Sequence, residues 1–284
     1  MTSLLRHGWR LALALATLFS LLAGCSALDT QQRRWIFQPE TESWRRGLQA
    51  TEGMADVWIE FASQETGQPA RLHALWHPRP EANAPVLLYL HGARWGVNGS
   101  AHRVRRMQSM GFSVLAIDYR GFGRSSAALP SESLAHEDAG AAWDWLAHRY
   151  PAQQRYIFGH SLGGAIAVHL ASEVADVQGL MLEGTFTSVA DVFSTMRWGW
   201  LPVSWLITQR FDSAERIARV RAPVLVVHGS DDTLIKPELG RALYENASEP
   251  KRWVLVEGGS HHSTHSVGQA HYEEALRDLF GWKP

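Results

Sequence analysis

The stretch YIFGHSLGG, residues 156–164, holds Ser161 between two glycines in G-x-S-x-G spacing. Apolar residues before the serine are typical of a buried strand, and the small and apolar residues after it are typical of a helix. Gly159 and Gly163 would allow a sharp strand-to-helix turn that leaves the hydroxyl alone at its tip. At the start of that helix, the Leu162 amide would face a developing oxyanion. The pattern predicts a serine nucleophile; the alternative is an ordinary glycine-rich turn.

A nucleophilic serine needs a base, and both a base and an orienting acid are available later in the chain. The segment VLVVHGSDDTLIKP offers Asp231 and Asp232, and VLVEGGSHHSTHS offers His261, His262 and His265. Each segment begins as a buried strand, and parallel sheets gather their ligands at the carboxyl ends of strands. The three histidines could also suggest zinc, but they lie on one loop without an acidic partner at diagnostic spacing. We therefore expect a serine, acid and histidine arrangement and no metal.

Alternating strand and helix patterns surround these residues. Helical patterns occupy 101–111, 132–150, 162–174 and 267–282. Strand patterns occupy 55–62, 71–78, 85–92, 112–123, 155–161, 179–185, 222–229 and 251–259. The first two strands alternate in polarity and are expected to pair antiparallel, whereas the later ones are continuous apolar runs. The order predicts an α/β fold with about eight strands, mostly parallel.

The composition is that of an ordinary globular protein. The chain has 284 residues, of which 45% are hydrophobic and 19% are charged, and its formal net charge is −1. This length suits one generous core or two small ones. No long basic or acidic run is present, so nothing predicts a nucleic-acid partner.

The first 24 residues have the features of a secretory signal peptide. Arg6 and Arg10 precede the apolar run LALALATLFSLLAG, which is shorter than the roughly 20 residues of a membrane-spanning helix. The following Cys25 is the single cysteine, so the chain cannot form an internal disulfide. LLAGC resembles a bacterial lipobox, which implies lipidation of Cys25; the alternative is a plain signal with an incidental cysteine. Ser26 at the next position resembles the sorting pattern for the outer membrane, and residues 25–50 are expected to form a polar tether.

Six stretches resemble the α/β-hydrolase superfamily, in particular its short-lidded Bem46-like and serine-aminopeptidase-like groups. They are YLHGARWGVNG, VLAIDYRGFGRSS, EDAGAAWDWL, YIFGHSLGGAIAV, APVLVVHGSDDTLIKP and VEGGSHH. In register they cover roughly residues 50 to 282, which implies a hydrolase domain over residues 51–284. The resemblance implies a nucleophile, acid and base at Ser161, Asp232 and His261, with Asp231 and His262 as the alternatives for the last two.

The resemblance also implies how the pocket is built. Ala93, which follows the His-Gly pair, matches the residue that completes the oxyanion hole with Leu162. Arg94 and Trp95 depart from the small or glycine-rich run common in relatives, and we expect them at the mouth of the pocket. A short lid is implied over residues 186–213. Its Phe193, Met196, Trp198, Trp200 and Trp205 could line an acyl pocket, pack as core or contact a membrane interface.

These features predict a lipid-anchored serine hydrolase of the bacterial cell envelope. We expect it to cleave a carboxylic ester or thioester through an acyl-enzyme, with a small or lipid-like acyl substrate and no cofactor. The alternatives are a serine peptidase or amidase acting on short peptides, and a non-catalytic envelope lipoprotein that uses the fold for binding. The natural substrate and the oligomeric state are not predicted.

Overall fold

A single eight-stranded sheet forms the centre of the protein. The computed structural model describes residues 2–39, 45–202 and 204–282. The strands lie in the order β1-β2-β4-β3-β5-β6-β7-β8, and only the pairs β1–β2 and β2–β4 are antiparallel. Their bounds are β1 Ala55–Ala62, β2 Pro69–His77, β3 Val86–Leu90, β4 Ser113–Ile117, β5 Arg155–His160, β6 Gly179–Glu183, β7 Val224–Gly229 and β8 Lys251–Val256. The predicted fold class and the antiparallel first pair are confirmed.

The sequence pattern explains which strands are central. Every residue of β3, β4, β5, β6 and β7 is buried, as expected for continuous apolar runs covered on both faces. The edge strand β1 instead mixes exposed and buried positions. The central strands are therefore fixed on both faces, and the loops at their carboxyl ends start from well-defined positions.

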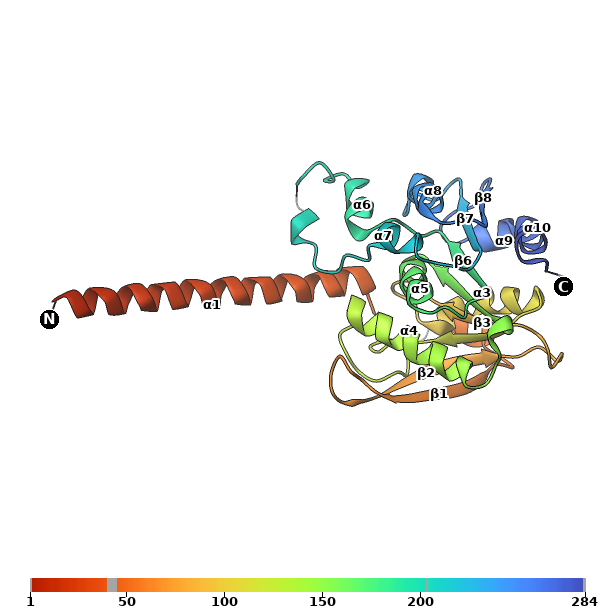
Figure 1. The fold of residues 1–284 in the computed structure, drawn as a ribbon, viewed down its shortest axis with the longest axis horizontal. Coiled ribbons are helices and arrows are strands. Elements are labelled where there is room, and N and C mark those ends of the chain that lie inside the picture. Colours follow the sequence, from red (N-terminus) through yellow and green to blue (C-terminus); the bar gives the residue numbers. More distant parts are fainter. Residues whose placement is uncertain (1, 40–44, 203, 283–284) are drawn as a thin grey trace.

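Helices cover both faces of the sheet (Figure 1). One hydrophobic cluster includes residues of α4 (Glu132–Ala147), α5 (Leu162–Glu173), α7 (Ser213–Ile217) and α8 (Pro237–Asn246). A second includes residues of α3 (Val97–Ser109) and α10 (Gln269–Phe280). Apart from α1, the other helices of the described residues are α2 Arg45–Ala50, η1 Ala152–Gln154, α6 Val189–Ser194, η2 Ser204–Leu206 and α9 Thr264–Val267. The sequence patterns predicted α3, α4, α5 and α10 but not α8.

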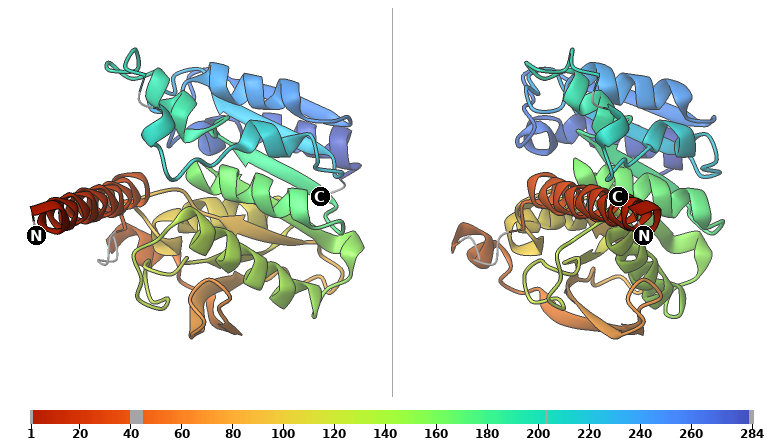
Figure 2. Two further views of the ribbon diagram at one scale, coloured as in Figure 1. Left: turned by 60° about the vertical axis from the view of Figure 1, so that its left-hand side comes forward. Right: turned by 90° about the vertical axis from the view of Figure 1, so that its left-hand side faces the viewer.

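Helix α1 (Thr2–Phe37) is continuous through Cys25 and extends away from the sheet (Figures 1 and 2). Its last turns pack against the domain, and Phe37 is fully buried in the first cluster. The predicted polar tether over residues 25–50 therefore includes a docked helical part. Among the described residues, no helix combines the length and apolar character needed to cross a membrane.

The lid region between β6 and β7 contains α6 and η2 and lies on the same side of the molecule as the projecting α1 (Figures 1 and 2). Hydrogen bonds join it to α1. The Gln32 side-chain amide donates to the Leu206 carbonyl at 2.7 Å and accepts from the Thr208 amide at 2.9 Å, and Asp29 accepts from the Thr208 hydroxyl at 2.7 Å. The end of α1 and the lid therefore form one packed assembly.

Candidate active site

Ser161 lies on a strained turn between β5 and α5. Its backbone has φ +55° and ψ −124°, a conformation that residues with a side chain rarely adopt. A Cβ at Gly159 would lie 2.3 Å from the Gly163 carbonyl oxygen, and a Cβ at Gly163 would lie 2.1 Å from the Leu90 carbonyl oxygen. The two glycines are therefore required by close backbone approach, which is the physical reason for the G-x-S-x-G spacing.

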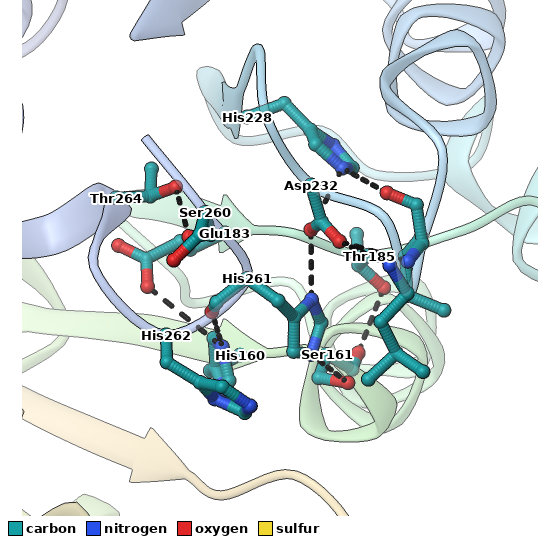
Figure 3. Close-up of polar contacts among 12 residues, drawn as sticks. His160, Ser161, Glu183, Thr185, His228, Asp232, Ser260, His261, His262 and Thr264 are labelled. Atoms are coloured by element: carbon teal, nitrogen blue, oxygen red, sulfur yellow. Dashed lines mark hydrogen bonds and ion pairs between the residues drawn. The ribbon is translucent and has the colours of Figure 1, made fainter. Parts of the chain in front are cut away.

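His261 connects Ser161 to Asp232 (Figure 3). The Ser161 hydroxyl lies 3.0 Å from His261 Nε2, and His261 Nδ1 lies 2.7 Å from Asp232 Oδ2. The three residues follow β5, β7 and β8, and their side chains meet at the carboxyl ends of these strands. A histidine that donates Nδ1–H to the carboxylate has Nε2 free to accept the serine proton.

The structure distinguishes the alternatives that the sequence left open. Asp232 is buried, whereas Asp231 is exposed and accepts a hydrogen bond from Ser230. His261 is buried between its two partners, whereas His262 is exposed, with its ring tilted by 49° against that of Trp95. No group of three or more potential metal ligands occurs in the part of the chain that the structure describes.

Asp232 is held in its ionised form. Burial opposes its charge, but hydrogen bonds from His228 and His261 outweigh burial and hold the pKa of Asp232 well below its usual range. The amides of Leu234 and Ile235 also donate to Oδ1, at 3.0 and 2.9 Å. His228 Nε2 lies 3.3 Å from Oδ2 of the same carboxylate. The acid is therefore fixed on both oxygens before any substrate binds.

The loop after β3, residues 92–95, runs beside the nucleophile and is called the rim loop here. A Cβ at Gly92 would lie 3.0 Å from the Ser161 Cβ. Strand β3 is paired directly with β5, which explains this proximity. Among the hydrogen bonds of the described residues, neither the Ala93 nor the Leu162 amide has an acceptor. Both amides are therefore available to a ligand near Ser161.

A buried ionic cluster supports the loop that carries His261, and the sequence analysis did not predict it. Arg103 of α3 donates Nε–H to Glu183 Oε1 at 3.0 Å. Its Nη2 lies 3.3 Å from each of the His261 and His262 carbonyl oxygens. The hydroxyl of Tyr272 donates to the other oxygen of Glu183. Although burial disfavours the guanidinium charge, Glu183 raises the pKa of Arg103, which therefore stays charged beneath the loop.

His160, which precedes the nucleophile, belongs to the same cluster. Its Nε2 lies 3.1 Å from the His261 carbonyl oxygen and 3.2 Å from Arg103 Nη2. Burial, with the nearby cation of Arg103, lowers the pKa of His160 well below its usual range. A neutral His160 packed under the His261 backbone fits a structural role.

A cavity of about 340 Å³ opens above Ser161. Arg94 and Trp95 line it, as does Gln38 from the end of α1. None of the five lid residues for which an acyl pocket was one alternative lines this cavity. Phe193 is half-buried, whereas Met196, Trp198, Trp200 and Trp205 are exposed on the lid. No carboxylate is among the residues that line the cavity in the described part of the chain.

The sequence is similar to a known protein family and to several known proteins. Residues 81–214 match the family model described as serine aminopeptidase, S33. An uncharacterised protein of Mycobacterium tuberculosis is 35% identical over 236 residues, which cover 82% of this chain and 81% of that protein. Lysophosphatidylserine lipase ABHD12 of Danio rerio is 32% identical over 225 residues, covering 72% of this chain and 58% of the lipase.

Solved structures share the fold at low sequence identity. The Pyrococcus furiosus esterase Pf2001 superimposes with a TM-score of 0.64 over 86% of this chain and 97% of the esterase, at 19% identity. At that identity the likeness concerns the fold alone.

Proposed function

The chain belongs to the α/β-hydrolase superfamily and is a hydrolase, and we propose that it cleaves carboxylic esters through an acyl-enzyme on Ser161. The observation that carries this proposal is the contact chain Ser161–His261–Asp232, with distances of 3.0 and 2.7 Å. These distances suit proton transfer from the hydroxyl to an imidazole that a carboxylate orients.

The proposed mechanism follows from these roles. His261 takes the Ser161 proton as the serine oxygen attacks the ester carbonyl carbon, and Asp232 stabilises the imidazolium. The amides of Ala93 and Leu162 stabilise the oxyanion of the tetrahedral intermediate. His261 then gives its proton to the departing alcohol. Water activated by His261 attacks the acyl-enzyme and releases the acid, which regenerates Ser161.

Labelling with a fluorophosphonate probe tests the nucleophile. We expect one adduct on the peptide that contains Ser161 and none in Ser161→Ala. Ser172→Ala, a serine of the following helix whose hydroxyl bonds the His169 carbonyl, serves as the matched control and should label like the wild type. An unlabelled wild type would favour the alternative of a non-catalytic binding protein, whereas a labelled Ser161→Ala would place the nucleophile at another residue.

A pair of neighbouring histidines tests the base. His261→Ala should lower kcat by about 10⁴-fold or more, because the serine loses its proton acceptor. His262→Ala should stay within about tenfold of the wild type, since among the described residues the hydrogen bond to the Ser161 hydroxyl comes from His261 and not from His262. Equal losses in both variants would contradict the assignment of His261.

An ester with an apolar acyl part is the substrate class that we propose, because a relative with a printed activity, at 32% identity, is a lysophosphatidylserine lipase. The family model's description raises an aminopeptidase as the second candidate. A free substrate amine would need a carboxylate, and none lines the cavity among the described residues. A panel of nitrophenyl esters of increasing chain length, an acyl thioester and an aminoacyl amide separates these classes; preference for the amide would overturn the ester proposal.

We also propose that Cys25 carries a lipid that attaches the protein to the bacterial envelope. Cys25 is exposed on α1 and has no disulfide partner.

The lid carries three exposed tryptophans, and tryptophan favours membrane interfaces. They are Trp198, Trp200 and Trp205, with exposed fractions of 56%, 73% and 79%. The fraction of protein that floats with lipid vesicles should fall when all three tryptophans are replaced by alanine. An unchanged fraction would show that the lid does not contribute to membrane binding.

A further inference from the structure

The end of α1 holds the rim loop at two points on Arg94. The Arg94 amide donates to the Phe37 carbonyl at 2.8 Å. The Arg94 guanidinium donates to Gln38 Oε1 from Nη2 at 2.8 Å and from Nε at 3.3 Å. These contacts between residues 37–38 and Arg94 are called the rim clamp below.

Both sides of the rim clamp have unfavourable backbone conformations. Arg94 has φ +78° and Gln38 has φ +45°, in the left-handed region that residues other than glycine rarely adopt. Such conformations persist only where surrounding contacts outweigh their cost, and they gather at functional sites. Without the rim clamp, the unfavourable φ of Arg94 would relax toward a commoner backbone conformation, and the neighbouring Ala93 would move with it.

The anchor for this contact is firm. Phe37 is fully buried, with ring centroids 5.9 Å from Phe211 and 6.5 Å from Phe122. One turn earlier, Arg33 Nε donates to the Pro130 carbonyl at 2.8 Å. The end of α1 is thus fixed to the core and to the loop before α4. Its Gln38 reaches from that fixed position to the cavity that contains Ser161 and His261.

We propose that Gln38 is a positioning residue, which holds the rim loop so that the Ala93 amide faces the reacting carbonyl oxygen. This inference rests on the proposed function of Ser161 and Ala93. An oxyanion donor is used mainly in the transition state, and a displacement of about 1 Å already costs a large part of its effect. The helix that carries the proposed lipid attachment site at Cys25 would therefore also help to position the oxyanion donor.

Kinetics of Gln38→Ala in the full chain test the rim clamp. We expect kcat on a nitrophenyl ester to fall about 5- to 20-fold with KM changed less than about twofold, because the lost contact acts in the transition state. Gln38→Glu retains an oxygen acceptor for Arg94 and should return kcat to within about twofold of the wild type. The rate of fluorophosphonate labelling should follow kcat, since the phosphonyl oxygen occupies the same oxyanion site.

A double-mutant cycle with Arg94→Ala shows whether the two side chains act together. If the rim clamp operates, the double variant will be no slower than Arg94→Ala alone. Gln32→Ala is the matched control, because it removes contacts of the same helix with the lid and none with the rim loop. That control should lower the melting temperature while leaving kcat unchanged.

The outcomes separate this inference from the proposed function. A wild type without activity on any ester overturns the proposed function and the rim clamp with it. An active wild type whose kcat is unaffected by Gln38→Ala overturns the rim clamp alone, as does additive behaviour of Gln38→Ala and Arg94→Ala. A lower melting temperature of Gln38→Ala with unchanged kcat would show that Gln38 contributes to stability only.

Discussion

Arg103 Nη2 lies 3.3 Å from the carbonyl oxygen of His261, so a buried cation on α3 holds the backbone of the residue whose side chain contacts Ser161. The contact joins segments 158 positions apart in the sequence. This contact fixes the backbone position from which the His261 imidazole extends, in addition to the hydrogen bond between that imidazole and Asp232.

Replacing Arg103 should therefore affect stability and catalysis together. Arg103→Ala leaves Glu183 buried without its cation, and breaking such a pair costs about 3–5 kcal/mol of the free energy of unfolding. Urea denaturation measures this loss. Arg103→Lys retains the charge but not the planar set of donors, so it should recover stability more than kcat. Full activity in Arg103→Lys would show that the contacts to the loop carbonyls are not needed.

The stability of the protein should depend on Asp232 in a defined pH range. The pKa of Asp232 is held below 3.8, its ordinary value, so the unfolded chain takes up this proton first on acidification. The stabilisation is complete above pH 5 or so and is lost as the pH falls through and below about 4. The difference in unfolding free energy between wild type and Asp232→Asn should therefore narrow in that range.

Asp231→Asn is the control for this experiment, because its carboxylate is exposed and accepts a hydrogen bond from Ser230 rather than from the catalytic histidine. It should track the wild type at every pH. A gap between wild type and Asp232→Asn that stays constant from pH 7 to pH 3 would contradict the ionised, hydrogen-bonded Asp232.

His136 and His169 form a second acid-sensitive feature, away from the active site. Their rings stack with centroids 3.6 Å apart between α4 and α5. Burial lowers the pKa of His136 to about 2 and that of His169 to about 4. Below pH 6.5 the two histidines bind protons in the unfolded chain but stay neutral in the folded protein. The free energy of unfolding therefore falls as the pH falls. His136→Phe should reduce that slope by up to about 1.4 kcal/mol per pH unit.

The slope is measured by urea denaturation between pH 4 and pH 7. Replacement of the exposed His271 by Phe should leave it unchanged. An unaltered slope in His136→Phe would mean that the ring pair accepts a proton in the folded state.

Two glycines offer a matched test of the turn at Ser161. Gly163→Ala would place a methyl group 2.1 Å from the Leu90 carbonyl oxygen, so the turn must shift and activity should be lost. Gly140 lies within α4, and a Cβ there meets nothing within 4 Å. Gly140→Ala should raise stability by about 0.5–1 kcal/mol through helix propensity, with activity unchanged. A fully active Gly163→Ala would show that the turn tolerates a side chain.

Cys25→Ala should release the protein from membranes, because the proposed lipid would have no attachment site. Fractionation of expressing bacteria and intact-protein mass measurement check this outcome. Ser26→Ala keeps the cysteine and should remain membrane-bound. Sedimentation of Cys25→Ala with the envelope would remove the anchor from the proposal.

Local sequence patterns were sufficient for the sheet and for the turn at Ser161. Continuous apolar runs identify buried strands, and the two glycines identify a close backbone approach. The choices between Asp231 and Asp232, and between His261 and His262, were carried by family resemblance, since neighbouring residues of one type differ only in burial.

The Arg103 cluster could not be predicted because its members come from α3, β6 and α10, and no local pattern relates these segments. The same holds for Gln38, whose segment was expected to be a polar tether. Phe37 was the available signal, since a large aromatic residue within a polar stretch often marks a point of docking. The sequence left the lid tryptophans open between an acyl pocket, core packing and a membrane interface, because their positions depend on a loop conformation that periodicity does not report.

The unbroken course of α1 has a consequence for how substrate would reach Ser161. From Cys25 to Phe37 the helix rises about 18 Å. If Cys25 is acylated, a helix and not a flexible tether sets the distance between the cavity and the lipid headgroups. An amphiphile could then pass from the bilayer to the enzyme over less than the width of one small domain, without dispersing into the surrounding water.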